Sequence, residues 1–411
     1  MSKHSKDRCD KKQSCRPVGA IFSATNPGVV NQETVPSDNE IFMFRRFGCG
    51  SLQEIDRERT GGIGTGPGTT FPVDPLGSQG SITTSDEGKF LFVVNAGASG
   101  ATGVTGTVSS MRIYKDKIKQ VDTVSSGGVF PVSCTSHKDL LYVLNAGDAT
   151  NVTGFRIKKD GKLDQIFVSA AGPTGTFGNY SMVNGQPTPF VSFLQNPTQV
   201  SFSPDGTKLV VSVKEYQGGA NGPRGALYVF SVLPNGELDL TSMVKNNSSG
   251  FLPWGFVFYN DYLIVTEIIG QGDPTLDPTG KSAISTYKLN NDNTLTPISI
   301  SVPSGQTSIC WISRAGKFVY SSNTGSNTIS KYRIHSDGHI SLRNATEFTT
   351  NNNPLDNIVL NDKYLCVLCA GEGSIQVLKI DEDNGHLKLT QTLKPFDPLA
   401  GAMGLAAVNF K

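Results

Sequence analysis

The chain has 411 residues, including 45 glycines and 22 prolines, and only 37% are hydrophobic, which predicts many turns and few helices. Its 36 Lys and Arg residues nearly balance 35 Asp and Glu residues. This balance argues against a nucleic-acid partner, because such proteins usually carry a basic excess. The sequence contains no run of about 18 apolar residues, the length that spans a bilayer, so no membrane partner is expected.

The N-terminal residues 1–17 are basic and polar and lack the apolar stretch of a secretory signal. Their composition predicts a disordered tail, followed by one domain over residues 18–411. Without a signal, a cytoplasmic location is the default expectation. The seven cysteines are scattered, and Cys366 and Cys369 lie within an apolar run, which predicts buried free thiols. No metal or cofactor is expected, and a monomer is predicted.

A four-strand pattern recurs along the rest of the chain, with turn residues between the strands. The second strand of each unit is apolar and usually ends in a polar residue followed closely by glycine. The repeat length of about 45–55 residues is typical of four-stranded propeller blades. The predicted second strands lie at residues 20–28, 88–97, 138–147, 206–215, 260–269, 316–325 and 361–371.

The number of units and the ring closure follow from counting the first strands. Seven first strands are predicted, and the last has no further strands behind it because the chain ends. The first unit, with strands at 20–28, 40–48 and 51–58, lacks a first strand. We therefore predict an all-β fold, a seven-bladed β-propeller of four-stranded antiparallel blades, whose C-terminal strand completes the N-terminal blade and removes the open edges. The first strands open at Ser78, Phe130, Pro197, Leu252, Thr307, Pro354 and Met403.

A functional site is expected on one face of the ring. In an antiparallel blade the start of the first strand and the end of the second lie at the same edge. Loops longer than about 12 residues are uncommon and often functional, and the long segments 97–106, 175–195, 215–225 and 270–280 are reached from that edge. They predict a rim over a central polar funnel.

The candidate residues on this funnel face fall into two groups. Glu267 ends an apolar strand and is the candidate catalytic base. The candidate substrate-binding residues are Asn95, Asn145, Gln199, Lys214, Arg224, Trp254 and Asn323.

Structural roles remain open for most of these candidates. The asparagines could form turns, because asparagine bonds its own backbone readily. Glu267 could bond backbone groups or an arginine, and Trp254 could pack between blades. Lys214 and Arg224 could be solvated charges beside a long loop.

Several motifs resemble the lactonase family of seven-bladed propellers. They include DPLGSQG at 74–80, VTGFRI at 152–157, SFSPDGTKLVVS at 201–212, PWGF at 253–256 and AGAMGLAA at 400–407. The family includes 6-phosphogluconolactonases and carboxymuconate-lactonising enzymes, so the resemblance implies the propeller fold and action on a lactone. The sequence departs from the Pro-His-x-His signature of catalytic relatives, since residues 196–199 read Asn-Pro-Thr-Gln.

Three functions are compatible with these observations. The first is hydrolysis of a sugar lactone or a related cyclic ester, with Glu267 as base and Lys214 or Arg224 holding a phosphate. The second is a non-catalytic propeller that binds a small molecule or a protein on its funnel face. The third is a structural or surface component, because a fold does not define a function.

Overall fold

The computed structural model describes residues 16–26, 38–64, 74–97, 106–147, 151–168, 182–183, 186–187, 194–216, 224–271, 279–398 and 400–410. Across these residues, the structure contains no helix with the length and apolar character needed to span a membrane. The predicted tail lies outside them except for its last two residues, and Pro17 begins the first strand.

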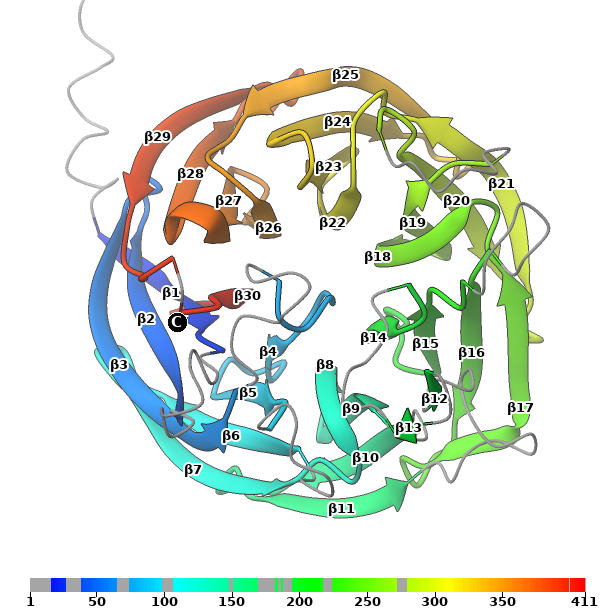
Figure 1. The fold of residues 1–411 in the computed structure, drawn as a ribbon. Helices are drawn as coiled ribbons and strands as arrows, with labels where there is room; N and C mark the ends of the chain where they lie inside the picture. The colour runs from blue at the N-terminus through cyan, green and yellow to red at the C-terminus, as the bar shows by residue number, and fades with distance from the viewer. Residues whose placement is uncertain are drawn as a thin grey trace, which may run out of the picture.

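The described residues form seven four-stranded antiparallel sheets arranged around a ring, as predicted (Figure 1). Blade 1 contains β30 (Met403–Asn409), β1 (Pro17–Ala24), β2 (Asp38–Phe47) and β3 (Leu52–Ile63). Blade 2 contains β4 (Ile82–Thr84), β5 (Phe90–Asn95), β6 (Thr107–Ile113) and β7 (Ile118–Ser125). Blade 3 contains β8 (Val129–His137), β9 (Leu140–Gly147), β10 (Asn151–Ile157) and β11 (Leu163–Val168).

The remaining blades follow in chain order. Blade 4 contains β14 (Pro197–Phe202), β15 (Lys208–Val213), β16 (Ala226–Val232) and β17 (Leu238–Asn247). Blade 5 contains β18 (Phe251–Tyr259), β19 (Tyr262–Ile269), β20 (Ala283–Leu289) and β21 (Leu295–Pro303). Blade 6 contains β22 (Ile309–Ala315), β23 (Phe318–Asn323), β24 (Thr328–Ile334) and β25 (Ile340–Thr349). Blade 7 contains β26 (Pro354–Leu360), β27 (Tyr364–Cys369), η1 (Ala370–Glu372), β28 (Ser374–Ile380) and β29 (Leu387–Leu393). A small hairpin joins β12 (Met182–Val183) to β13 (Gln186–Pro187).

The two ends of the chain share blade 1. The C-terminal strand β30 runs antiparallel to β1, with Gly19 opposite Asn409 and Ile21 opposite Ala407. The Phe410 N–H donates to the Val18 carbonyl at 3.0 Å. The last strand of the sequence is therefore the innermost strand of the first blade, as the strand count predicts.

Burial follows the position of a strand within its blade. The second strands β5 and β9 are buried at every residue, whereas all residues of the outer strand β17 after Leu238 are half-buried or exposed. Neighbouring blades cover both faces of an inner strand, so it carries an unbroken apolar run. The core lies between the blades, where clusters of apolar side chains join one sheet to the next.

The beginning of blade 2 differs from the prediction. The first strand was expected to open at Ser78, but β4 begins only at Ile82. The preceding residues turn towards the axis instead, and the Gln79 N–H donates to the Thr198 carbonyl of blade 4 at 2.9 Å. These backbone groups find their partners on other blades, which is why the strand starts late.

Candidate functional site

A polar side chain stands at the end of the second strand in four blades: Asn95, Asn145, Glu267 and Asn323. Each of these residues pairs with the first residue of the third strand. Glu267 also lies opposite Pro253 of the first strand, so this edge is the predicted funnel face. All four side chains are buried.

The asparagines connect strands of their blades, and the Asn95 amide oxygen also accepts hydrogen bonds from Asn39 and Thr60 of blade 1. The Asn95 amide donates to the hydroxyls of Thr107 at 3.0 Å and Ser109 at 2.8 Å, both on β6. Asn323 donates to two hydroxyls of β24 in the same manner. Asn145 donates to the Ser126 carbonyl at 3.0 Å. These bonds support a structural role, and substrate binding by the asparagines stays a prediction.

Glu267 holds blade 5 together in an equivalent way. One carboxylate oxygen accepts from the Gly250 N–H at 2.8 Å, from the Ser248 hydroxyl at 3.2 Å and from the Tyr287 hydroxyl at 3.3 Å. The other oxygen accepts from the Ser301 hydroxyl at 2.6 Å. Burial raises the pKa of Glu267, and the hydroxyl and N–H donors oppose that rise. Its donors belong to its own blade and the connection before it, so its role as base stays a prediction.

Two other predicted residues bond to backbone groups. The Gln199 amide donates to the Phe256 carbonyl at 3.0 Å and accepts from the Phe256 N–H at 2.7 Å, which joins blade 4 to blade 5. The Arg224 guanidinium donates to the Ser249 carbonyl at 2.8 Å and lies 5.3 Å from the centroid of the Phe251 ring. A substrate contact for either residue remains untested.

Lys214 and Trp254 lie together inside the ring. Lys214 follows β15 directly, at the position held by Ala96 in blade 2 and Ala146 in blade 3, and it is buried. Its Nζ lies 4.1 Å from the centroid of the Trp254 ring, within the range of a cation–π contact. Trp254 in turn meets Trp311 edge-on, with ring centroids 5.5 Å apart. Blade-to-blade packing, the structural role considered for Trp254, is thus observed.

Asp74 and Cys310 complete this group, which we call the axial cluster: Asp74, Lys214, Trp254 and Cys310. Burial raises the pKa of Asp74, while the Gly77 N–H, which donates to its Oδ1 at 2.8 Å, and the Lys214 charge oppose that rise. Burial lowers the pKa of Lys214, and the Asp74 charge opposes that fall. Burial also raises the pKa of Cys310, with Asp74 adding to the effect. The three ionisable groups are therefore close enough to influence one another.

The axial cluster contains two residues that the sequence indicated and two that it did not. Lys214 and Trp254 were candidates, whereas Asp74 and Cys310 were not. The available signals were the motif DPLGSQG, which carries the family resemblance and contains Asp74, and the predicted first strand from Thr307, which contains Cys310. Periodicity alone gave no reason to choose them.

The cluster has the components of acid–base chemistry. A carboxyl group with a raised pKa and an amine with a lowered pKa can exchange protons nearer neutrality than exposed side chains do. Perturbed titratable groups beside one another are common at functional sites. Within the described ranges, His, Cys, Asp and Glu form no group of three or more that could hold a metal ion.

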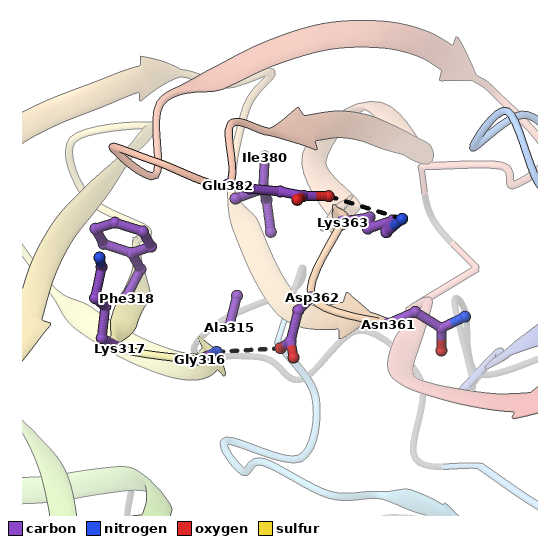
Figure 2. A pocket seen from close by; sticks show the side chains of 9 residues that line it. All are labelled: Ala315, Gly316, Lys317, Phe318, Asn361, Asp362, Lys363, Ile380 and Glu382. Atoms are coloured by element: carbon purple, nitrogen blue, oxygen red, sulfur yellow. Dashed lines mark hydrogen bonds and ion pairs between the residues drawn. The ribbon is translucent and has the colours of Figure 1, made fainter.

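Two cavities lie on the opposite face of the ring. Figure 2 shows a cavity of about 400 Å³ between the β22–β23 and β26–β27 turns, where Lys363 and Glu382 form an ion pair at 3.7 Å. The Asp362 carboxylate in the same cavity accepts from the Gly316 N–H at 3.1 Å. A second cavity of about 650 Å³ lies between the corresponding turns of blades 4 and 5. Because both occupy the same junction in the repeat, we attribute them to blade geometry.

The structure describes only the ends and short parts of the four long segments that were predicted to form the rim. Most of the segments 97–106, 175–195, 215–225 and 270–280 lies outside the described residues, so the rim and the polar funnel remain predictions.

Comparisons with known proteins agree with the architecture. The model of the family described as lactonase, 7-bladed beta-propeller, matches residues 282–397, from the end of the β19–β20 connection through blade 7. No curated protein matches the sequence. The chain is a seven-bladed β-propeller, and its residues 282–397 resemble the lactonase family of such propellers.

Solved structures resemble the whole ring. The periplasmic gluconolactonase of Pseudomonas aeruginosa is 16% identical, with 95% of this chain and 99% of that chain covered and a TM-score of 0.65. A candidate 6-phosphogluconolactonase from Bacteroides fragilis is 16% identical, with coverage of 96% and 98% and a TM-score of 0.64. A protein from Lactobacillus plantarum is also 16% identical, with coverage of 96% and 100% and a TM-score of 0.64. At these identities the likeness shows the fold.

Proposed function

We propose that the protein hydrolyses a small lactone, with a sugar lactone as the expected substrate class, and that the axial cluster performs the reaction. The observation that carries the proposal is the buried Lys214 amine, 4.1 Å from the centroid of the Trp254 ring, whose pKa burial lowers and the Asp74 charge raises. The lactonase family match and the gluconolactonase among the structural neighbours support the reaction class.

The proposed reaction assigns one task to each charged group. Asp74 takes a proton from water as the water oxygen attacks the lactone carbonyl carbon. The Lys214 ammonium stabilises the negative charge that develops on the carbonyl oxygen. The ring C–O bond then breaks, and the proton passes from Asp74 to the departing alkoxide oxygen. The product is the open-chain hydroxy acid, so one water molecule is consumed for each ester bond broken.

The pH dependence follows from the two perturbed groups. Asp74 must be ionised to accept a proton, so activity falls as the pH drops through its pKa, which burial raises above the ordinary 3.8. Lys214 must be protonated to stabilise the oxyanion, so activity falls as the pH rises through its pKa, which burial lowers below the ordinary 10.5. A bell-shaped profile of kcat/KM is expected, narrower than the interval between the two ordinary values.

The test is hydrolysis of δ-lactones of aldonic acids, with and without a terminal phosphate, measured as acid release above the spontaneous rate. We expect Asp74→Asn and Lys214→Met each to lower kcat/KM about 100-fold or more. Asp362→Asn and Lys363→Met, in the cavity of Figure 2, are the matched controls and should leave it unchanged. Full activity in the Asp74 variant would remove Asp74 as base.

The same experiment separates hydrolysis from binding alone. Thermal stabilisation by a lactone or its hydroxy acid, without any hydrolysis, would favour the non-catalytic ligand-binding propeller. Loss of activity in Glu267→Gln with full activity in Asp74→Asn would instead favour Glu267 as the base.

A further inference from the structure

The innermost strands of a propeller present unpaired backbone groups to the central axis, and such groups need partners when they are buried. Side chains supply several of these partners in the described part of the ring. The Gln199 amide bonds both backbone groups of Phe256. The Asp356 carboxylate accepts from the Leu405 N–H at 2.8 Å. Each of these bonds joins neighbouring blades.

One segment makes such bonds across the ring. Residues 74–80, which we call the axial plug, precede β4 of blade 2. The Gln79 amide donates to the Ile312 carbonyl at 3.0 Å and accepts from the Ile312 N–H at 3.1 Å. The Trp311 indole N–H donates to the Ser78 carbonyl at 2.9 Å. Both partners lie on β22 of blade 6, on the other side of the axis from β4 (Figure 1).

The axial plug is also fixed to the intervening blades. The Ser78 hydroxyl donates to the Val132 carbonyl of blade 3 at 2.7 Å. The Ser133 hydroxyl donates to the Gln79 carbonyl at 2.7 Å, and the Gln79 N–H reaches blade 4. Leu76 is buried in the apolar cluster that contains both tryptophans. The plug therefore touches blades on several sides of the axis.

Blade 5 leaves room for the plug at a glycine. A Cβ atom on Gly255 would lie 2.1 Å from Gln79 Oε1 and 2.9 Å from the Cys310 carbonyl oxygen. No side chain fits at these distances without a shift of its neighbours. The Gly255 position is thus shaped to the Gln79 side chain.

We propose that the axial plug positions Asp74 against Lys214, with Gln79 and Trp311 as the positioning residues. Asp74 begins the plug, and the turn that joins it to Gly77 is closed by the hydrogen bond between the Gly77 N–H and its carboxylate. The bonds of Gln79 and Ser78 to blade 6 hold the far end of the same short segment. The inference rests on the proposed function only in treating Asp74 as catalytic, because the positioning can be measured without turnover.

The test follows the titration of Lys214 in the full-length protein. Trace acetylation with acetic anhydride, read by mass spectrometry between about pH 5 and pH 11, gives the midpoint for the Lys214 amine. Asp74→Asn removes a charge that raises the pKa of Lys214, so it should lower that midpoint by about one pH unit.

The positioning variants are then combined with Asp74→Asn. Gln79→Met removes both bonds to Ile312, and Trp311→Phe removes the indole N–H bond to Ser78 but retains an aromatic ring at the position that meets Trp254. In either background, Asp74→Asn should shift the midpoint by less than half of the shift seen in the wild-type background. Gln199→Met is the matched control, because it also loses two bonds to one backbone position but leaves the plug intact. There the full shift is expected.

Three results would overturn the proposal. The first is no shift from Asp74→Asn in the wild-type background. The second is an undiminished shift in both positioning backgrounds, where Trp311→Phe serves if Gln79→Met does not fold. The third is an equal reduction in the Gln199→Met background, which would indicate general loosening. If the coupling is present but no lactone is hydrolysed, the proposed function fails while the positioning stands.

Discussion

Glu267 occupies the place that asparagine holds in blades 2, 3 and 6, and it accepts hydrogen bonds at both carboxylate oxygens. A buried acceptor that loses its donor, or a donor left without an acceptor, weakens folding by about 1–3 kcal/mol. Because the Glu267 carboxylate accepts several hydrogen bonds, we expect a substitution of Glu267 to change the stability of the fold before it changes activity.

Glu267→Gln should therefore destabilise the protein by about 1–3 kcal/mol, because an amide nitrogen would replace one accepting oxygen. Turnover per folded molecule should be unchanged. Urea unfolding and lactone hydrolysis measured on the same preparation check both expectations. A base role predicts the reverse pattern, with turnover lost and unfolding unaffected.

Asp356 is a second buried carboxyl group with a structural partner. It accepts from the N–H groups of Leu405 and Asn357, and burial raises its pKa to about 7 from the ordinary 3.8. The unfolded chain ionises this group at lower pH than the folded protein does. Its contribution to stability is therefore greatest below the ordinary pKa and falls as the pH rises towards 7.

Asp356→Asn should remove this pH dependence. The variant should gain roughly 1–3 kcal/mol at pH 8 relative to the wild type, because it avoids burying a charge, and no comparable gain at pH 4. Chemical unfolding at both pH values measures the difference. Equal effects at the two values would mean that Asp356 is not titrating in this interval.

For the candidate site residues, the sequence predicted the edge of the blade at which each one lies better than it predicted what each side chain does there. The strand alternation placed Glu267 and the asparagines at the correct edge, but both faces of a second strand are buried between blades. An edge position therefore does not say whether a side chain faces the axis or the adjacent sheet. Lys214 was a candidate because it flanks the long segment 215–225 at the end of a predicted second strand.

At the scale of elements, a buried ion pair inside blade 6 also makes the contact with blade 7. Lys331 of β24 meets Glu347 of β25 at 2.8 Å, and both side chains are at least 96% buried. The Glu347 carboxylate also accepts from the Leu387 N–H of blade 7 at 3.0 Å and lies 2.8 Å from His386 Nδ1. Burial tends to raise the pKa of Glu347, but the Lys331 and His386 bonds outweigh it and lower the pKa.

Glu347→Gln should cost about 3 kcal/mol of stability, because it leaves the Lys331 ammonium buried without its charge partner. A depressed carboxyl pKa stabilises the fold above the ordinary value of 4.5 and loses that effect as the pH falls through the folded-state pKa. The stability difference between Glu347→Gln and the wild type should therefore become smaller at acidic pH. Thermal unfolding across pH measures it, and Lys331→Met in the same chain should restore part of it.

Strands and blades could be predicted from the sequence where short-range patterns define them. The alternation of apolar residues, the turn residues and the repeat length predicted every blade. The start of blade 2 was not predictable in this way, because the path of residues 74–80 depends on partners in blades 3, 4 and 6. Asp74 was missed for the same reason, since its place at the axis comes from contacts distant in sequence.

At the scale of the whole molecule, the ring depends on β30. Its residues Met403, Leu405, Ala406 and Val408 are all buried, and it pairs with β1 along most of its length. It also provides the Leu405 N–H that Asp356 binds. Losing it would expose the inner edge of β1 and an apolar face of blade 7.

Deletion of residues 401–411 should lower stability by several kcal/mol or yield aggregates, because buried apolar area contributes about 25 cal/mol per Å². Size-exclusion chromatography and thermal unfolding measure both outcomes. A synthetic peptide of residues 400–411 added in trans should restore part of the melting temperature. A truncated protein as stable as the full chain would contradict the importance of the shared blade.

The shared blade also has a consequence for biosynthesis. The strands β1, β2 and β3 are synthesised long before β30, the strand that covers the apolar inner edge of β1. Until β30 has been made, that edge, with Ala20, Ile21 and Phe22, is open to pairing with other nascent chains. The circle of blades therefore closes only after all seven blades have been synthesised, and protection by chaperones would matter most at the inner edge of β1.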